Sequence, residues 1–300
     1  KSGRGHFDEV EFLTIADVVA RTNALTTGEI DAMNRADLRT VHLLARRKGI
    51  RVEEVTGTLH YTIPMHTDTP PYDDNHVRLA LKFAVDREVM LKIILKGHGA
   101  LGNDHPISTA NRYHASELPQ RKYDLDKAKF HLKKAGLTSL NVDLSAADAA
   151  FTGAVDAAVL YKEQAAKAGI NINVVREPND GYWSNVWLKK PWSMVYWGGR
   201  PTEDMMFSQS LAEGADWNES RFSHKRFNEL LVAARAELDE AKRRAMYVEM
   251  QTIVNMEGGT VVPLFANYVF AMSDKVKHDK KMAGNWDMDG DKAIERWWFG

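Results

Sequence analysis

The chain repeats one pattern, in which a segment with helical spacing of apolar residues ends at a glycine and a short β-branched segment follows. The pattern is clearest over residues 124–144 and 155–175, where Gly136 and Gly169 separate the helix-like part from the strand-like part. Glycine after the last apolar residue of a helix is a common stop signal, and short apolar runs bounded by such signals favour strands. Alternating helices and strands are typical of layered folds, and we therefore predict an α/β architecture.

Further segments fit the same alternation. We expect strands over residues 10–15, 29–33, 50–55, 59–65, 140–144, 170–175, 194–196, 261–265 and 269–271. We expect helices over residues 17–26, 38–48, 77–84, 88–95, 124–135, 155–168, 222–236 and 239–256, and loops over residues 67–74 and 97–119. With 300 residues, the chain is long enough for roughly two domains. The units within residues 66–260 indicate one lobe, and residues 1–65 and 261–300 are expected to pair as part of a second.

Charge and composition exclude several classes of protein. The 40 basic and 41 acidic residues leave a net charge of −1, whereas a non-specific nucleic-acid binder needs a clear cationic excess. The sequence has no cysteine, which excludes thiol catalysis, zinc sites built on cysteine and disulfides. It has no run of about 18 apolar residues that would span a membrane. Residues 1–10 lack the apolar core of a signal peptide.

Residues 97–102 read GHGALG and match the dinucleotide-binding pattern G-x-G-x-x-G. That pattern binds a pyrophosphate when a strand precedes it and a helix begins after it, because the amides of the helix N-terminus then face the phosphates. Here a helix-like segment comes before, and Asn103, Asp104 and Pro106 come shortly after. We interpret the match as coincidental and expect no nucleotide cofactor. A nucleotide-dependent enzyme stays open as an alternative.

Eleven histidines suggest a possible metal site. None lies in an H-E-x-x-H motif, and no group of His, Asp and Glu has the spacing of a ligand set. His60 and His66 flank an expected strand with even spacing, which places both on one face. Surface or hydrogen-bonded histidines are the commoner outcome of such spacing. We therefore expect no metal and no catalytic residue, with a metal-dependent enzyme as an open alternative.

Tryptophan is concentrated in the second half of the chain. All eight tryptophans lie between residues 183 and 298, and we expect Trp187 and Trp192 to be core residues. Trp197 is the best candidate for a ligand pocket, because it ends a strand and two glycines, Gly198 and Gly199, follow it and let backbone approach a ligand closely. Arg200 comes next, and its guanidinium suits a carboxylate or phosphate. A surface salt bridge is the alternative role for Arg200.

Several segments carry motifs that occur together in one family. Residues 70–87 resemble the pattern PPFxDxxVRxALxxAxDR. Residues 24–32 resemble ALxxGEIDA, residues 123–137 resemble YDPxKAKxLLxxAGY, residues 164–174 resemble QLKxxGIxV, and residues 243–251 resemble RxxxYxxxQ before the apolar strand at 262–265. In this order, they resemble the family 5 extracellular solute-binding proteins, the peptide, nickel and opine receptors of ABC importers.

Members of that family are considerably longer than 300 residues, so the resemblance implies their C-terminal portion. It implies a two-lobe fold of the periplasmic-binding-protein type, in which the lobe at residues 66–260 is complete and the lobe made of 1–65 and 261–300 is partial. The N-terminal share of the partial lobe, with the signal peptide, is expected to precede Lys1. The resemblance further implies a periplasmic location and connecting strands near residues 63–66 and 261–265.

The loop after the strand at 194–196 departs from the family pattern. In peptide-binding relatives it reads Trp-x-x-Asp, and the aspartate holds the ammonium group of the peptide. Trp197 matches the tryptophan, but Arg200 stands at the aspartate position. With the charge reversed, a carboxylate or phosphate is attracted and an ammonium is repelled. Asp204 remains a candidate partner for an ammonium.

The resemblance also implies what the site does, namely capture without chemistry. Arg200 is expected to clamp an anionic group of a peptide-like, opine-like or other small solute, Trp183 and Trp197 to stack on it, and Asp148 to contact a polar edge. The two lobes are expected to close on the solute and then dock on a membrane permease. The alternatives are the enzymes named above and an interaction module without a small-molecule ligand.

Overall fold

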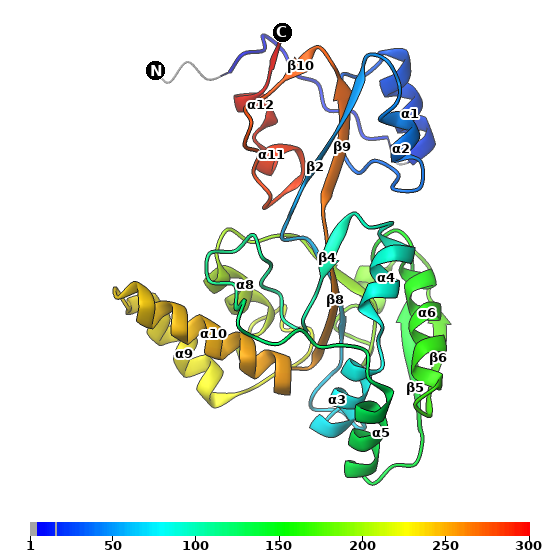
Figure 1. Ribbon diagram of the computed structural model, residues 1–300, viewed down its shortest axis with the longest axis vertical. Coiled ribbons are helices and arrows are strands. Elements are labelled where there is room, and N and C mark those ends of the chain that lie inside the picture. Colours follow the sequence, from blue (N-terminus) through cyan, green and yellow to red (C-terminus); the bar gives the residue numbers. More distant parts are fainter. Residues whose placement is uncertain (1–4, 16) are drawn as a thin grey trace.

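The computed structural model describes residues 5–15 and 17–300, and its chain forms two parts (Figure 1). The smaller part consists of the described residues up to 55 together with residues 268–300, and the larger part consists of residues 60–266. Lys1, where we expected the matching portion to begin, lies outside the described residues.

The smaller part is built on a three-stranded antiparallel sheet with the order β1-β9-β2. Along β9 (Tyr268–Ser273), Val269 and Ala271 pack under α1 and α2, whereas Tyr268 and Phe270 pack on the opposite face with Trp297. The other elements are α1 (Val18–Thr27), β1 (Ala32–Met33), α2 (Val41–Leu44), β2 (Ile50–Val55), β10 (Val276–Lys277), α11 (Asp287–Asp291), α12 (Ala293–Arg296) and β11 (Trp298–Phe299).

The larger part holds a four-stranded sheet with the order β4-β8-β3-β7 and a parallel pair, β5 and β6. Its strands are β3 (His60–Pro64), β4 (Gly99–Leu101), β5 (Leu140–Ala146), β6 (Ile170–Arg176), β7 (Val195–Trp197) and β8 (Thr260–Ala266). Its helices are α3 (Asn75–Phe83), α4 (Arg87–Ile94), α5 (Leu125–Lys134), α6 (Ala154–Ala166), α7 (Tyr182–Asn185), α8 (Glu203–Ser210), α9 (Lys225–Ala236) and α10 (Glu240–Glu257).

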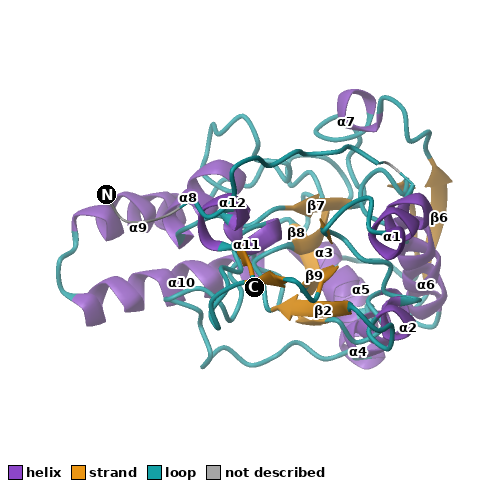
Figure 2. Ribbon diagram, turned by 90° about the horizontal axis from the view of Figure 1, so that it is seen from above, coloured by secondary structure: helices purple, strands orange, loops and turns teal. Residues whose placement is uncertain are grey.

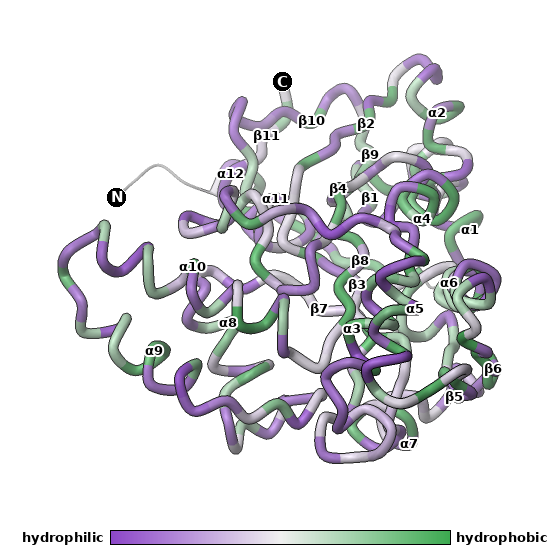
Figure 3. Tube along the Cα trace, turned by 60° about the horizontal axis from the view of Figure 1, so that its bottom comes forward, coloured by the Kyte–Doolittle hydropathy of each residue, from purple (hydrophilic) through white to green (hydrophobic). Residues whose placement is uncertain are grey.

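Every residue of β8 is buried, and Figure 3 shows the hydrophobic residues gathered along β3 and β8 in the middle of this part. The helices α9 and α10 extend away from the sheets, as the view from above shows (Figure 2). The larger part therefore has a central sheet whose strand β8 is fully buried, with helices on more than one side.

The predicted boundaries between the parts lie a few residues away from the connections that the structure shows. We expected the chain to cross between the lobes near residues 63–66 and 261–265. However, β3 and β8 pair with β4 and β7 in the sheet of the larger part. The connections are instead residues 56–59, between β2 and β3, and Asn267, between β8 and β9.

Most of the predicted elements are present, but the loop expected over 97–119 contains β4, the strand expected over 29–33 is shortened to β1, and two further predictions are wrong. Residues 10–15 form no strand, because they have no strand partner and leave Phe12 and Leu13 exposed. The helix expected over 38–48 is reduced to α2. The Asp37 side chain accepts a hydrogen bond from the backbone N–H of Arg39, which favours a turn before the helix, and i to i+3 hydrogen bonds tighten the chain after Leu44.

Aspartate side chains set the starts of the helices. Asp74, Asp86, Asp124 and Asp239 each accept a hydrogen bond from a backbone N–H in the first turn of α3, α4, α5 and α10. These caps satisfy amides that have no partner within the helix, and the negative charge suits the positive end of the helix dipole. They explain why these helix starts were predicted to within about two residues.

A buried polar network fastens α3 to the end of α10. Lys82 is fully buried, and its Nζ donates to the carbonyl oxygens of Val254, Asn255 and Gly258 at 2.8–3.2 Å. Asp104 is buried between Arg87 at 2.6 Å and Arg121 at 2.7 Å. Cations at the C-terminus of a helix satisfy its last carbonyl groups and its dipole. The segment 70–87 that resembles the family signature therefore has an architectural role here.

Candidate functional site

A cavity of about 780 Å³ lies between the two parts of the chain. The smaller part contributes Val55 and residues 282–285 to its wall, and the connection at residues 56–59 contributes Thr56 and Thr58. The larger part contributes residues 110–113, 200–204 and side chains of α9 and α10. Of the residues predicted from the sequence, Arg200 and Asp204 line this cavity. Both parts of the chain therefore contribute to the cavity that Arg200 lines.

Arg200 is held by neutral groups. Its Nε donates to the Gln209 side-chain oxygen, and its Nη1 donates to the carbonyl oxygens of Gly198 at 3.3 Å and Gly199 at 3.1 Å. Its guanidinium lies 5.3 Å from the centre of the Trp197 ring, in a cation–π arrangement. Within residues 5–15 and 17–300, no carboxylate forms an ion pair with it. Burial lowers the pKa of Arg200 below its ordinary value, but a guanidinium stays charged at neutral pH.

Three other arginines line the cavity. Arg112 pairs with Glu240 at 2.9 Å, and Arg235 pairs with Asp204 at 2.7 Å. Arg243 donates to the backbone oxygen of Glu237 at the turn between α9 and α10. The arginines at 112 and 235 are thus neutralised locally, whereas the charge of Arg200 is not.

Gly198 and Gly199 have no room for a side chain, and the neighbours that fill this space come from the smaller part and from the connection at residues 56–59. A Cβ on Gly198 would collide with the Trp286 ring, and a Cβ on Gly199 would collide with Thr58 and with the backbone oxygen of Asn285. We predicted that these glycines admit a ligand. The structure shows them admitting the 285–286 segment, which packs against the loop directly before Arg200.

Trp197 belongs to a connected group of aromatic rings. It is only 4% exposed and makes edge-to-face contacts with Trp187 and Trp217, with ring centres 6.5 Å and 5.9 Å away. Trp187 in turn contacts Trp183, which is 40% exposed. The row therefore runs from Arg200 over Trp197 and Trp187 to Trp183.

A buried carboxyl group lies below this row of rings. The Trp187 indole N–H donates to Glu219 at 2.8 Å, and burial raises the pKa of Glu219 to about 7 against the effect of this hydrogen bond. Sequence reasoning missed Glu219 and Trp217, since a single acid and a single tryptophan in a loop carry no pattern. Trp192 is a core residue, as predicted, at 1% exposure.

The two predicted aspartates have protein partners. Asp204 lines the cavity, but its carboxylate is bound by Arg235. Asp148 lies in the turn after β5, where its Oδ1 accepts a hydrogen bond from Val155 N at 3.3 Å. Neither Asp148 nor Trp183 is among the residues that line the cavity. The structure therefore brings Arg200, Trp197 and Asp204 close together and leaves Asp148 outside the cavity wall.

The glycine pattern at residues 97–102 has a structural explanation. The segment forms β4, and a Cβ on Gly99 or Gly102 would collide with the backbone oxygens of Phe265 and Val262 on β8. No helix begins after it before α5 at Leu125. The glycines thus permit close strand packing, and the helix N-terminus that the nucleotide-binding mechanism needs is missing from this segment.

The two histidines singled out from the sequence are buried. Burial lowers the pKa of His60 to about 4 and that of His66 to about 4, so both are neutral at pH 7. His60 is hydrogen-bonded to the Thr58 carbonyl oxygen at 3.1 Å. Among the described residues, no group of three or more His, Asp or Glu side chains is arranged to hold a metal ion.

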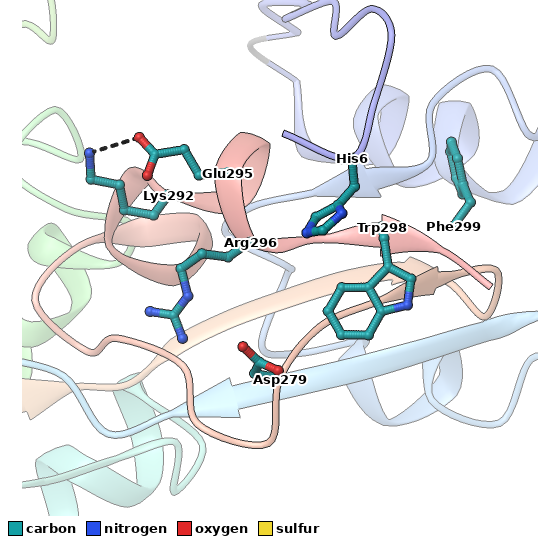
Figure 4. A pocket seen from close by; sticks show the side chains of 7 residues that line it. All are labelled: His6, Asp279, Lys292, Glu295, Arg296, Trp298 and Phe299. Atoms are coloured by element: carbon teal, nitrogen blue, oxygen red, sulfur yellow. Dashed lines mark hydrogen bonds and ion pairs between the residues drawn. The ribbon is translucent and has the colours of Figure 1, made fainter. Parts of the chain in front are cut away.

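A second cavity of about 970 Å³ opens on the smaller part (Figure 4). Three of the charged groups along it already have protein partners: Lys292 pairs with Glu295 at 3.4 Å, and Arg296 pairs with the buried Asp289 at 3.0 Å. None of the sequence-predicted residues lines it. Its chemistry therefore does not match the predicted site, and we assign the candidate site to the cavity between the two parts.

In the described portion of the chain, no helix is long and apolar enough to cross a membrane. The fold and the cavity between two parts define a protein of the periplasmic-binding type. The family model for bacterial extracellular solute-binding proteins, family 5 (middle) matches residues 1–219. The chain belongs to this family, which confirms the resemblance inferred from its motifs.

Individual relatives support the same assignment. The chain is 24% identical to the dipeptide-binding protein of Escherichia coli (strain K12) over 271 residues, which are 85% of this chain and 49% of that protein. It is similar in structure to AgaA from A. tumefaciens R10 in complex with agropinic acid, with a TM-score of 0.84, 21% identity and coverage of 100% of this chain and 62% of AgaA.

Another similar structure is the periplasmic binding protein DppA from Helicobacter pylori in complex with the peptide STSA, with a TM-score of 0.81 and 22% identity. It covers 95% of this chain and 56% of DppA. These similarities confirm the predicted α/β fold of the periplasmic-binding-protein type. The chain spans about half the length of the curated relatives it matches, at 49% for the dipeptide-binding and oligopeptide-binding proteins of E. coli.

Proposed function

We propose that this protein is the solute receptor of an ABC importer and that it captures an anionic small solute, peptide-like or opine-like, in the cavity between its two parts. In this proposal it acts in the periplasm, binds no cofactor and catalyses no reaction. The two parts correspond to two lobes that close on the solute, and the closed form delivers it to a membrane permease.

The observation that carries the anionic ligand is the charge state of Arg200. It lines the cavity, is partly withdrawn from water and has only neutral partners in the described chain. A guanidinium in such a setting gains a charge-assisted, bidentate partner when a carboxylate or phosphate enters. The same position repels an ammonium group, so a peptide bound by its N-terminus is disfavoured.

The aromatic row begins at Arg200 beside the cavity wall and offers a second candidate surface for the solute. Trp197 fixes one face of Arg200, and the exposed face of Trp183 offers a flat apolar surface near the end of the row. Stacking on indole rings suits the body of an opine or a planar part of a small peptide. We keep Asp148 as a candidate contact for a polar edge of the solute and Asp204 as a candidate for an ammonium group.

A thermal-shift and calorimetric screen tests the proposal, because a ligand that binds the folded state raises its melting temperature. The probes are agropinic acid, glutathione and the peptide STSA, which the names of similar proteins suggest. We expect the acidic compounds to stabilise the protein more than STSA does.

The decisive variant is Arg200→Gln, and the matched control is Arg235→Gln, an arginine of the same cavity that Asp204 already neutralises. We expect Arg200→Gln to weaken binding of the acidic probe by at least about tenfold, on the order of a buried charge-assisted hydrogen bond, and the control to change it much less. Equal affinities of the wild type and Arg200→Gln would remove Arg200 from the site.

A further inference from the structure

The segment from Met288 to Asp291 has an unusual backbone. Four consecutive residues have left-handed conformations, with φ values of 48°, 62°, 68° and 62°, and only Gly290 among them is a glycine. Residues with a side chain adopt this conformation singly and at a cost, and a run of them does not persist without support from its surroundings. Some contact in the fold must therefore hold this turn in place.

The support comes from the carboxylate of Asp289, which is 1% exposed. Its Oδ1 accepts a hydrogen bond from the backbone N–H of Ala283 at 2.6 Å, and its Oδ2 accepts one from the Trp297 indole N–H at 3.3 Å. The Arg296 guanidinium lies 3.0 Å from the same Oδ2. Charge-assisted hydrogen bonds of this kind are stronger than those between neutral groups, so one side chain ties the turn to two other segments.

The segment held by Asp289 is a wall of the candidate solute cavity. Met282, Ala283, Gly284 and Asn285 line that cavity. Gly284 accepts a hydrogen bond from Thr58 N at 3.0 Å, which connects the wall to the chain between β2 and β3. The next residue, Trp286, packs on Gly198, two residues before Arg200. Asp289 therefore holds the 282–286 segment through Ala283, and this segment lines the same cavity as Arg200.

We propose that Asp289 is a positioning residue for solute binding, which sets the 282–286 wall against the Arg200 loop without touching the solute itself. The inference rests on the proposed function for its ligand, but the geometry it describes exists in the unliganded protein. The left-handed turn is needed for this contact, because it reverses the chain after Trp286 and brings the Asp289 carboxylate back to the amide of Ala283.

Hydrogen–deuterium exchange tests the anchor in the full chain without any ligand. In Asp289→Asn, the amide group that replaces one carboxylate oxygen cannot accept a hydrogen bond, and the charge facing Arg296 is lost. We expect the backbone amide of Ala283 to exchange at least about tenfold faster, while peptides from β5 and β6 exchange as in the wild type. Asp291→Asn is the matched control, since Asp291 shares the left-handed backbone and its side chain forms no hydrogen bond or ion pair with the described residues.

A milder variant covers the case in which Asp289→Asn unfolds the smaller part. Trp297→Phe keeps an aromatic ring but removes the indole donor to Asp289 and part of the packing of this buried side chain, and we expect a smaller increase in exchange at the same amide than in Asp289→Asn. Acrylamide quenching of the Trp286 emission, assigned with Trp286→Phe, should rise in the same order. Unchanged exchange at Ala283 in both Asp289→Asn and Trp297→Phe would overturn the proposal.

Titration with agropinic acid separates this inference from the proposed function. If the wild type binds the probe, we expect Asp289→Asn to bind it at least about fivefold more weakly, and Asp291→Asn to bind as the wild type does. Equal binding by wild type and Asp289→Asn would show that the wall does not matter for the solute and would refute the positioning role. If the wild type does not bind agropinic acid, that ligand is removed from the proposed function, and the exchange result alone decides the role of Asp289.

Discussion

Replacement of Asp104 by asparagine tests the buried network directly. The carboxylate has no exposed surface, and it accepts hydrogen bonds from Arg87 at 2.6 Å, Arg121 at 2.7 Å and the backbone N–H of Val262 at 3.1 Å. The partner guanidinium groups are 2% and 4% exposed, so water cannot replace the lost charge. Burial raises the pKa of Asp104, but the charges of Arg87, Arg121 and Lys82 outweigh it and hold the pKa below its ordinary value.

An asparagine has the same shape as Asp104 but only one accepting oxygen, and its amide group would face a donor of one of the arginines. Removing one partner of a buried ion pair typically costs about 3–5 kcal/mol, because the remaining charges are left uncompensated. We expect a loss of this size in the free energy of unfolding, measured by urea titration with circular dichroism.

The control is Asp68→Asn, which removes an exposed ion pair with Arg221 at 3.2 Å and is expected to cost about 0–1 kcal/mol. A loss of less than about 1 kcal/mol for Asp104→Asn, similar to the control, would refute the argument that this network is held by charge.

Three further predictions concern stability. Burial lowers the folded-state pKa of His60 to about 4, which is below the unfolded value of about 6.5. The contribution of neutral His60 to the free energy of unfolding is therefore complete above pH 6.5 and is lost as the pH falls toward 4. The free energy of unfolding from urea titrations should fall between pH 7.5 and pH 5.0, and this fall should be about 2 kcal/mol smaller in His60→Gln than in the wild type. The same pH dependence in both proteins would show that His60 does not cause it. Gly102→Ala, whose Cβ collides with the Val262 carbonyl oxygen, should lower stability by about 1–3 kcal/mol, and an unchanged urea midpoint would show that β4 can move aside. Asp86→Ala removes the cap on Val89 N and should cost about 1 kcal/mol in the same assay, whereas Asp126→Ala, an exposed acid within α5, should cost clearly less; equal losses would contradict the capping role.

The fold was predictable from the sequence where local chemistry decides structure. Asp124 and Gly136 mark the two ends of α5, and the β-branched run after Gly169 becomes β6, because caps and side-chain spacing act over a few residues. The segment at residues 10–15 shows the limit, since a strand also needs a neighbour to pair with, and that neighbour cannot be read from the segment itself.

The site was predictable only in part. The reversed charge at Arg200 was visible as a departure from a known motif. The wall formed by residues 282–285, by contrast, reaches the cavity through a turn that depends on Asp289, and an isolated aspartate near the end of a chain carries no signal. Gly198 and Gly199 were singled out because they would let a ligand come close, and the sequence could not tell that Trp286 and Thr58 fill this space.

A single residue, Asn267, separates β8 from β9, and these two strands belong to different sheets. Its amide donates to the His98 carbonyl oxygen at 3.2 Å, and its side chain donates to Glu54 on β2 at 2.5 Å. The strands β8 and β9 therefore follow each other almost without interruption, one in the larger part and one in the smaller part. If the two parts rotate against each other on this side, the torsion angles of Asn267 are the ones between the two strands that must change.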